Sequence, residues 1–228
     1  MNIDNNMRFD LHVHSTYSGD SVTTIHEIIK QAEAAGLSGV AICDHNTTEG
    51  GLRAARLAEE LHTDLQIIPG IEVSTSEGHL LILGVTESIP PGRTVKETIR
   101  AAERLDGLSI APHPFKYGRK KGIGYRGSQN VDAIETMNSR CRLICSNRRA
   151  REAAEALQKP QVAGSDSHQL ETIGRAYTEI TPRGGESILD AIREGRTRPA
   201  GRLAPIRVMV KQAYRGVRRN LKPQHRLK

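Results

Sequence analysis

The chain has 228 residues, of which 37% are hydrophobic and 26% are charged, and its formal net charge is +7. This length is enough for one large α/β domain, and no apolar run approaches the ~20 residues that a membrane-spanning helix needs. Residues 1–8 are polar and lack the apolar stretch of a signal peptide, and three cysteines are an odd and sparse set. We therefore expect a cytoplasmic protein with reduced thiols, not a membrane protein or a disulfide-stapled one.

Short apolar runs alternate with amphipathic helical patterns along the chain, which predicts a parallel α/β fold. The expected strands are residues 7–13, 39–43, 65–69, 71–74, 79–85, 109–111, 133–137, 161–163 and 177–180. Two helices are expected to begin after Thr24 and Thr94, and three more are expected over residues 49–61, 147–157 and 186–194. Thr24 and Thr94 each precede a Glu by three residues, and this capping-box spacing marks a helix N-terminus.

About seven strands with intervening helices predict a distorted (β/α)7 barrel. We place it in a single domain of residues 1–200, followed by a tail of residues 201–228. Such barrels build their active sites at the carboxyl ends of the strands. Residues 115–130 interrupt the alternation, because this stretch is rich in Gly, Lys and Arg and too long for a tight connection. Loops of that length are usually functional or mobile.

Histidines and acids recur where the predicted strands end. The residues concerned are His12, His14, Asp20, His45, Glu72, His79, His113, Asp166 and His168. Residues two apart on a strand point to the same side, so His12 and His14 can reach one ion, and Asp166 and His168 repeat this spacing. One such pair arises easily by chance, but the joint pattern is far more specific. Imidazole and carboxylate without thiolate suit a cluster of divalent cations, which indicates a metal-dependent hydrolase.

These residues resemble, in order and context, the polymerase and histidinol phosphatase (PHP) family of phosphoesterases. The similarity covers residues 7–180 and rests on the motifs DLHVHSTYSGD, CDHNTTEGG, IIPGIEVSTSEGHLLILG, APHP, IETMNSR and GSDSH. Within the family the chain is most similar to the stand-alone branch of nucleoside 3′,5′-bisphosphate phosphatases and short-RNA exonucleases. The resemblance implies a PHP-type barrel and hydrolysis of a phosphate ester.

The resemblance also implies two or three divalent metal ions (Mn, Fe or Zn) in the site. The first ion would be held by His12, His14, Glu72 and Asp166. Glu72 would bridge to a second ion, which is also held by His79 and His113. The third would be held by Asp20, His45 and His168. Of these ligands we expect a part in catalysis for Asp20, His45, Glu72, Asp166 and His168.

Phosphoester chemistry explains why metal ions suffice. Cations bind the phosphate oxygens, deprotonate a bridging water near neutral pH and stabilise the leaving oxygen, so attack by a metal-bridging hydroxide needs no protein nucleophile.

Asp44 precedes His45 and should point to the other side of the strand, as a hydrogen-bond partner or a packing residue.

Substrate recognition is predicted from basic residues outside the ligand set. Arg140 lies in a stretch that resembles one lining the PHP site and can clamp a phosphate, although an ordinary surface Arg is the alternative. Lys116 and Arg119, interleaved with Tyr117 and Tyr125, suit a nucleotide or a short single strand, unless the loop is merely solvated. The favoured substrate is therefore a nucleotide or a short oligonucleotide. A histidinol-phosphate-type monoesterase and a nucleic-acid-binding protein with a purely structural barrel are the alternatives.

The C-terminal region carries the excess positive charge. Residues 201–228 contain nine Lys or Arg and no acid, whereas the rest of the chain has 24 basic and 26 acidic residues. Apolar residues at helical spacing over residues 206–221 predict a basic amphipathic helix. This helix can pack on the barrel with its cations in solvent, or it can meet RNA or another anionic surface.

Overall fold

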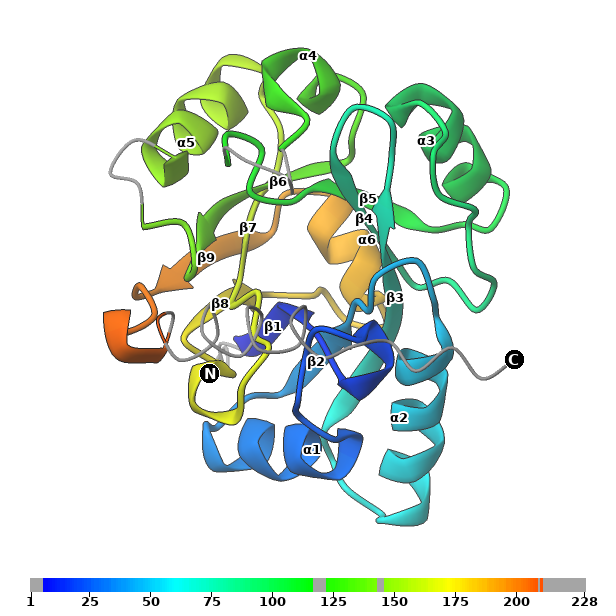
Figure 1. Cartoon of the computed structure of the whole chain (residues 1–228), viewed down its shortest axis with the longest axis vertical. Helices are drawn as coiled ribbons and strands as arrows, with labels where there is room; N and C mark the ends of the chain where they lie inside the picture. Colours follow the sequence, from blue (N-terminus) through cyan, green and yellow to red (C-terminus); the bar gives the residue numbers. More distant parts are fainter. Residues whose placement is uncertain (1–5, 117–121, 143–145, 209, 211–228) are drawn as a thin grey trace, which may run out of the picture.

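The structure is a computed structural model that describes residues 6–116, 122–142, 146–208 and 210. Its centre is one sheet with the strand order β7-β6-β5-β4-β3-β2-β1-β8-β9 (Figure 1). The strands are β1 (Met7–Val13), β2 (Gly39–Ile42), β3 (Gln66–Ser74), β4 (His79–Leu83), β5 (Leu108–Ala111), β6 (Ala133–Asn138), β7 (Gln161–Gly164), β8 (Ala176–Ile180) and β9 (Thr197–Gly201). The helices are η1 (Thr16–Ser18), α1 (Ile25–Ala34), α2 (Glu49–Glu60), α3 (Val95–Glu103), α4 (Gly124–Ser128), α5 (Ser146–Ala156), η2 (Leu170–Thr172) and α6 (Ile188–Arg193).

The sheet curls into a nearly closed barrel. It closes where the edge strand β7 approaches β1: beyond β7, the amide of Ser167 donates to the carbonyl of His12 over 3.3 Å, and the amide of His14 donates to the carbonyl of Ser167 over 2.9 Å. The side chain of Thr178 further ties β8 to β7, accepting from the amide of Ala163 and donating to its carbonyl. The predicted barrel is therefore confirmed.

Strand directions differ from the expected parallel arrangement. The pairs β1–β2, β2–β3, β5–β6 and β6–β7 are parallel, but β4 runs antiparallel to both of its neighbours, and β8 and β9 are antiparallel as well. Only four residues connect β3 to β4, and a connection this short permits a hairpin but not a parallel crossover. The expectation of a parallel fold is therefore wrong for the pairs that β4 and β8 form.

Three further expectations need correction. The two strands expected at residues 65–69 and 71–74 form the single strand β3, which continues through Pro69 and Gly70. The expected loop at residues 115–130 contains the short helix α4. Strand β9 was missed because its sequence, TRPAG, has neither apolar alternation nor high strand propensity.

Apolar side chains fill both sides of the sheet. One cluster inside the barrel joins Phe9, Leu11 and Leu83 to Ala191 and Ile192 of α6. A Cβ on Gly84, which follows β4, would lie 2.4 Å from Leu189, so α6 closes the barrel at the end where β4 finishes. Outside the barrel, α1 and α2 cover one side of the sheet and α3 and α5 the other (Figure 1). The opposite rim, where β4 begins, remains for polar residues.

The predicted capping boxes are present at two helices. Thr24 accepts from the amide of Glu27, whose carboxylate accepts from the amide of Thr24, and Thr94 and Glu97 repeat the arrangement.

Among the described residues, no helix is long and apolar enough to cross a membrane.

Candidate metal centre

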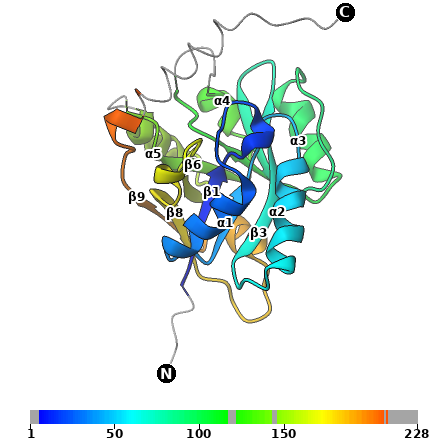
Figure 2. The same cartoon turned by 60° about the horizontal axis from the view of Figure 1, so that its bottom comes forward.

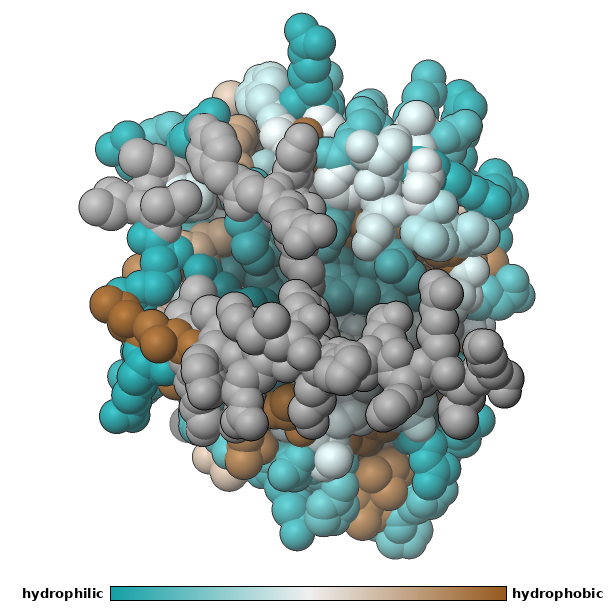
Figure 3. Space-filling view, viewed as in Figure 1, coloured by the Kyte–Doolittle hydropathy of each residue, from teal (hydrophilic) through white to brown (hydrophobic). Residues whose placement is uncertain are grey.

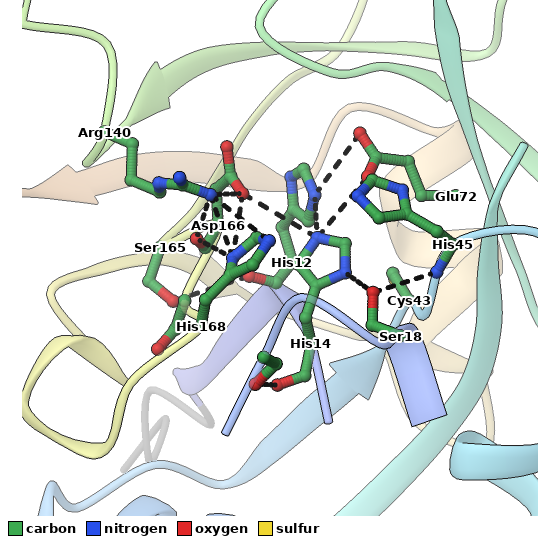
Figure 4. A network of polar contacts seen from close by, with 12 residues as sticks. His12, His14, Ser18, Cys43, His45, Glu72, Arg140, Ser165, Asp166 and His168 are labelled. Atoms are coloured by element: carbon green, nitrogen blue, oxygen red, sulfur yellow. Dashed lines mark hydrogen bonds and ion pairs between the residues drawn. The ribbon is translucent and has the colours of Figure 1, made fainter. Parts of the chain in front are cut away.

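All nine predicted ligands lie at one rim of the barrel. His12 is at the end of β1, Glu72 is near the end of β3, and others directly follow β1, β2, β5 and β7. His79 begins the antiparallel β4, and because it pairs with Ser74 it lies at the rim where β3 ends. Figure 4 shows several of these side chains converging, and a hydrophilic recess is visible near the middle of this face in Figure 3.

Glu72 is surrounded by imidazoles. Its Oε1 lies 2.6 Å from His79 Nδ1, 3.1 Å from His113 Nε2 and 3.8 Å from His12 Nε2. Its Oε2 lies 2.8 Å from His45 Nδ1 and 3.4 Å from His14 Nε2. Burial opposes ionisation of this carboxyl, but the imidazoles of His45 and His79 outweigh it and hold the pKa of Glu72 well below its usual range. Glu72 is thus an anion that touches five of the six clustered histidines.

His12 and His14 face each other directly. Their Nε2 atoms are 3.1 Å apart, so one ring must supply the proton between them. Burial lowers the pKa of His12, but the carboxylates of Glu135 and Asp166 raise it by more. The resulting pKa lies well above its usual value. Burial and the ring of His168 lower the pKa of His14 well below its usual value. The two facing rings therefore have pKa values shifted in opposite directions.

Asp166 has a different surrounding from Glu72. Its Oδ1 accepts from Arg140 Nη1 over 2.8 Å, and its Oδ2 accepts from Lys116 Nζ over 3.1 Å. Burial raises the pKa of this carboxyl, but the guanidinium and ammonium groups outweigh burial and hold it well below its usual range. His14 Nε2 lies 3.7 Å and His168 Nδ1 lies 3.5 Å from Asp166 Oδ1. Two of the predicted phosphate-binding residues therefore meet a predicted metal ligand.

Asp20 joins the site from the loop after η1. Its Oδ2 lies 3.3 Å from His168 Nε2 and 3.4 Å from His45 Nε2. Burial opposes ionisation, but the hydrogen bonds to these two rings hold the pKa of Asp20 far below its usual range. Ser18 fixes the loop, because its hydroxyl donates to Asp20 Oδ1 over 3.0 Å and contacts His14 Nδ1 at 3.1 Å.

The donor set fits divalent metal ions. Within the described residues, four overlapping groups of imidazole nitrogens and carboxylate oxygens have donor atoms within 4.8 Å of one another: His14, Asp20, His45 and His168; His12, His14 and Asp166; His12, Glu72 and His113; and His45, Glu72 and His79. Such mixed N and O donors match Mn²⁺, Fe²⁺ and Zn²⁺. Because the groups share members, the division of ligands among particular ions stays a prediction.

Glu135 is a functional residue that the sequence analysis missed. It lies on β6, where its Oε1 is 3.0 Å from His12 Nδ1. Its Oε2 accepts from the amide of His113 over 2.8 Å and from Asn138 Nδ2 over 2.9 Å. An acid within the buried strand Ala133–Asn138 was the available signal, since buried carboxylates need partners. This side chain orients the ring of His12 and the backbone that carries His113.

Asp44 and Asp10 hold the loops after β1 and β7 in place through hydrogen bonds. Asp44 points away from the ligands, as predicted, and accepts from the amide and hydroxyl of Ser15 over 2.6 and 2.7 Å. Asp10 accepts from the amides of Ser165 and Gly174 over 2.8 and 2.9 Å. Burial raises the pKa of each carboxyl to about 6.

Two predicted ligands have unusual backbone conformations. His113 has a φ of 33° and Asp166 a φ of 52°, a region that residues other than glycine seldom adopt. Strain of this kind concentrates at functional sites, where surrounding contacts hold it in place. Arg119 and Tyr117, which were predicted to contact substrate, lie outside the described residues.

Comparisons with known proteins agree with this geometry. The model of the PHP domain matches residues 10–106, and that of the PHP-associated family matches residues 145–197. An uncharacterized protein of Methanocaldococcus jannaschii is 36% identical over 144 residues, which are 58% of this chain and 82% of the relative. A 5′-3′ exoribonuclease of Haemophilus influenzae is 32% identical over 126 residues, 51% of this chain and 45% of the relative.

A solved structure shares the fold. A two-domain protein of Bacteroides vulgatus, described as containing a predicted PHP-like metal-dependent phosphoesterase, superimposes with a TM-score of 0.69 at 17% identity over 92% of this chain and 70% of its own. The barrel, the imidazoles and carboxylates at its rim and the match to the PHP domain together identify a metal-dependent hydrolase of phosphate esters. The chain belongs to the PHP family.

Proposed function

We propose that this phosphoesterase hydrolyses a phosphate ester of a nucleotide or a short oligonucleotide. The observation that carries the proposal is the pairing of two unlike groups at one rim: a carboxylate among imidazoles at Glu72, and fixed cations at Asp166. The first suits metal ions, and the second suits the negative charge of a phosphorylated substrate. The H. influenzae relative named as an exoribonuclease supports a nucleic-acid substrate.

The nine rim residues are the proposed ligands, namely His12, His14, Asp20, His45, Glu72, His79, His113, Asp166 and His168. When bound, divalent ions supply a Lewis acid for the phosphate oxygens and lower the pKa of water. Glu72 contributes two oxygens to different imidazole groups and is the proposed bridge between ions. Asp20, between His45 and His168, keeps both rings turned toward the site.

Arg140 and Lys116 are the proposed substrate-binding residues. Their side chains reach Asp166 from β6 and from the loop after β5, and their heads are mostly shielded from solvent. The Arg140 Nε atom is buried and has no hydrogen-bond partner in the described part of the chain, which leaves a donor for a phosphate oxygen. Arg119 belongs to the same proposal on its sequence position alone.

The test is a substrate panel assayed with Mn²⁺-loaded enzyme. A nucleoside 3′,5′-bisphosphate, a short RNA and histidinol phosphate are compared at equal metal loading, with a chelated sample as the control. We expect turnover of the first two to exceed that of histidinol phosphate. Preferential turnover of histidinol phosphate would establish the small-molecule alternative, and RNA binding without hydrolysis of any substrate would establish the binding-protein alternative.

A further inference from the structure

Three arginines lie in the segments that join β8 and β9 to the rest of the barrel. Arg175 lies just before β8, and Arg202 and Arg207 lie in the segment that follows β9. The amide of Arg202 donates to the carbonyl of Arg175 over 2.8 Å, which joins the two stretches. Figures 1 and 2 show the segment after β9, in orange, beside β8 and β9. We call Arg175, Arg202 and Arg207 the arginine triad.

The triad is attached to the two loops that carry Arg140 and His168. The amide of Ala204 donates to the carbonyl of Ser139 over 2.7 Å, directly before Arg140. Gln169, which follows His168, donates from Nε2 to the carbonyl of Val208 over 3.2 Å. Arg142 bridges the gap, since its guanidinium donates to the carbonyl of Ala204. The segment that carries Arg202 and Arg207 is therefore bonded to the loops that carry Arg140 and His168.

The charges of the triad are not compensated by the described residues. Burial and the neighbouring guanidiniums of Arg202 and Arg207 lower the pKa of Arg175, so the three cations act on one another. None of them forms an ion pair with a carboxylate in the part of the chain that the structure describes. Nearby on the same edge, Arg8 and Arg198 both pair with Glu179. The triad is therefore a place where a polyanion would relieve repulsion.

We propose that the arginine triad binds the backbone of a single-stranded nucleic acid whose terminal phosphate lies at the metal centre. This inference rests on the proposed function and narrows its substrate class from a nucleotide or a short oligonucleotide to a strand of several nucleotides. Guanidinium groups match phosphates with two parallel hydrogen bonds, and phosphate contacts supply most of the affinity for a strand of any sequence. Seven further Lys or Arg occur at residues 211–228, so the sequence continues the same charge.

A membrane surface is the competing partner for this edge. Leu203, Ile206 and Val210 are exposed beside the arginines, with 39%, 61% and 60% of their surface accessible. The attachment of the segment to Ser139 and Gln169 favours the nucleic acid, because it places the cations next to the loops that hold Arg140 and His168. A strand that enters the metal centre would pass these cations. Binding to a membrane would not require the cations to lie next to the metal centre.

The experiment compares two triple variants of the full-length chain. Arg175→Gln, Arg202→Gln and Arg207→Gln remove the triad, and Arg93→Gln, Arg100→Gln and Arg104→Gln remove three exposed charges around α3 as the matched control. Binding of a fluorescent eight-nucleotide RNA is measured by anisotropy with chelator present, across a salt series. We expect the triad variant to raise Kd about tenfold or more and to reduce the slope of log K against log salt by about 2, since each single-strand phosphate contact contributes about 0.7. The control should match the unmodified chain.

Hydrolysis supplies the second measurement. With Mn²⁺ loaded, the ratio of kcat/KM for the RNA to kcat/KM for a nucleoside 3′,5′-bisphosphate should fall about tenfold in the triad variant and stay constant in the control. RNA affinity that is equal in the two triple variants overturns the inference. So does a triad variant that loses binding only to phosphatidylserine vesicles. Triad-dependent RNA binding without hydrolysis of either substrate by the unmodified enzyme would refute the proposed function and leave the binding site standing.

Discussion

Glu72 and Asp166 are two buried carboxylates at the same rim with opposite surroundings. Glu72 is contacted by five imidazoles, whose charge depends on pH and which bind metals when neutral. Asp166 is contacted by Lys116 and Arg140, which stay charged at physiological pH. Both carboxyl groups have a lowered pKa, but different groups lower it.

The contrast divides the rim into two halves with separate tasks. The half around Glu72 is suited to gathering metal ions, because neutral imidazoles and one anion neutralise part of the ionic charge. The half around Asp166 holds, beside this proposed ligand, the cations of Lys116 and Arg140, which suit the negative charge of a phosphorylated substrate. Changes on the Glu72 side should therefore affect metal content first, and changes on the Asp166 side should affect substrate binding first.

The largest effect should come from Glu72→Gln. An amide cannot neutralise cations, and one of its two polar atoms is a donor that faces imidazole nitrogens. We expect the metal content to fall by at least one ion per chain and kcat/KM to fall about 10³-fold, since an ion supplies several kcal/mol of transition-state stabilisation. Elemental analysis and phosphate-release kinetics measure both quantities. Glu103→Gln on the exposed side of α3 is the control, and full metal content in Glu72→Gln would contradict the division.

Glu135→Gln should have the next largest effect. This carboxylate contacts His12 Nδ1 and accepts a hydrogen bond from the amide of His113. Its loss therefore leaves two proposed ligands less firmly oriented. Changes at residues that orient ligands typically cost 10–100-fold in metal affinity, and we expect about that loss here. Calorimetric titration with Mn²⁺ gives the affinity, and circular dichroism checks the fold. If the variant bound Mn²⁺ as tightly as the unmodified chain, Glu135 would be only a packing residue.

Arg140→Lys tests the other half of the rim. Lysine keeps the charge but loses the planar guanidinium, so Asp166 remains compensated while a phosphate loses its paired donors. A hydrogen bond to a charged group contributes about 1.5–3 kcal/mol, which corresponds to a rise in KM of about 10–100-fold at unchanged metal content. Arg151→Lys, exposed on α5, is the matched control. A loss of metal without a change in KM would place Arg140 on the metal side instead.

The sequence predicted which side chains gather at this rim better than it predicted their surroundings. His12, His14, Asp166 and His168 could be found because strand periodicity and strand ends are visible in short segments. Glu135 could not, because its role depends on β6 lying beside the loop of His113, a contact between distant segments. The reversed β4 and the added β9 escaped notice for a related reason. Hairpin pairing and edge strands depend on partners that local propensity does not reveal.

The smallest effect, and the most specific test of the contrast, concerns the proton of His12. Glu135 and Asp166 raise the pKa of His12 well above its usual value of 6.5, so this ring is protonated at pH 7.5 in the metal-free protein. A ligand nitrogen must be free of its proton, and Mn²⁺ binding at pH 7.5 should therefore release the proton of His12. His14, His113 and His168 have lowered pKa values and are already neutral at this pH, so they release none. As the pH falls toward the lowered pKa values of these three rings, protons compete there too, and metal affinity should decline. Titration in two buffers of different ionisation enthalpy measures the release. Glu135→Gln removes the carboxylate that raises the pKa of His12 most, so the variant should release fewer protons, whereas equal release in both proteins would assign the proton to another group.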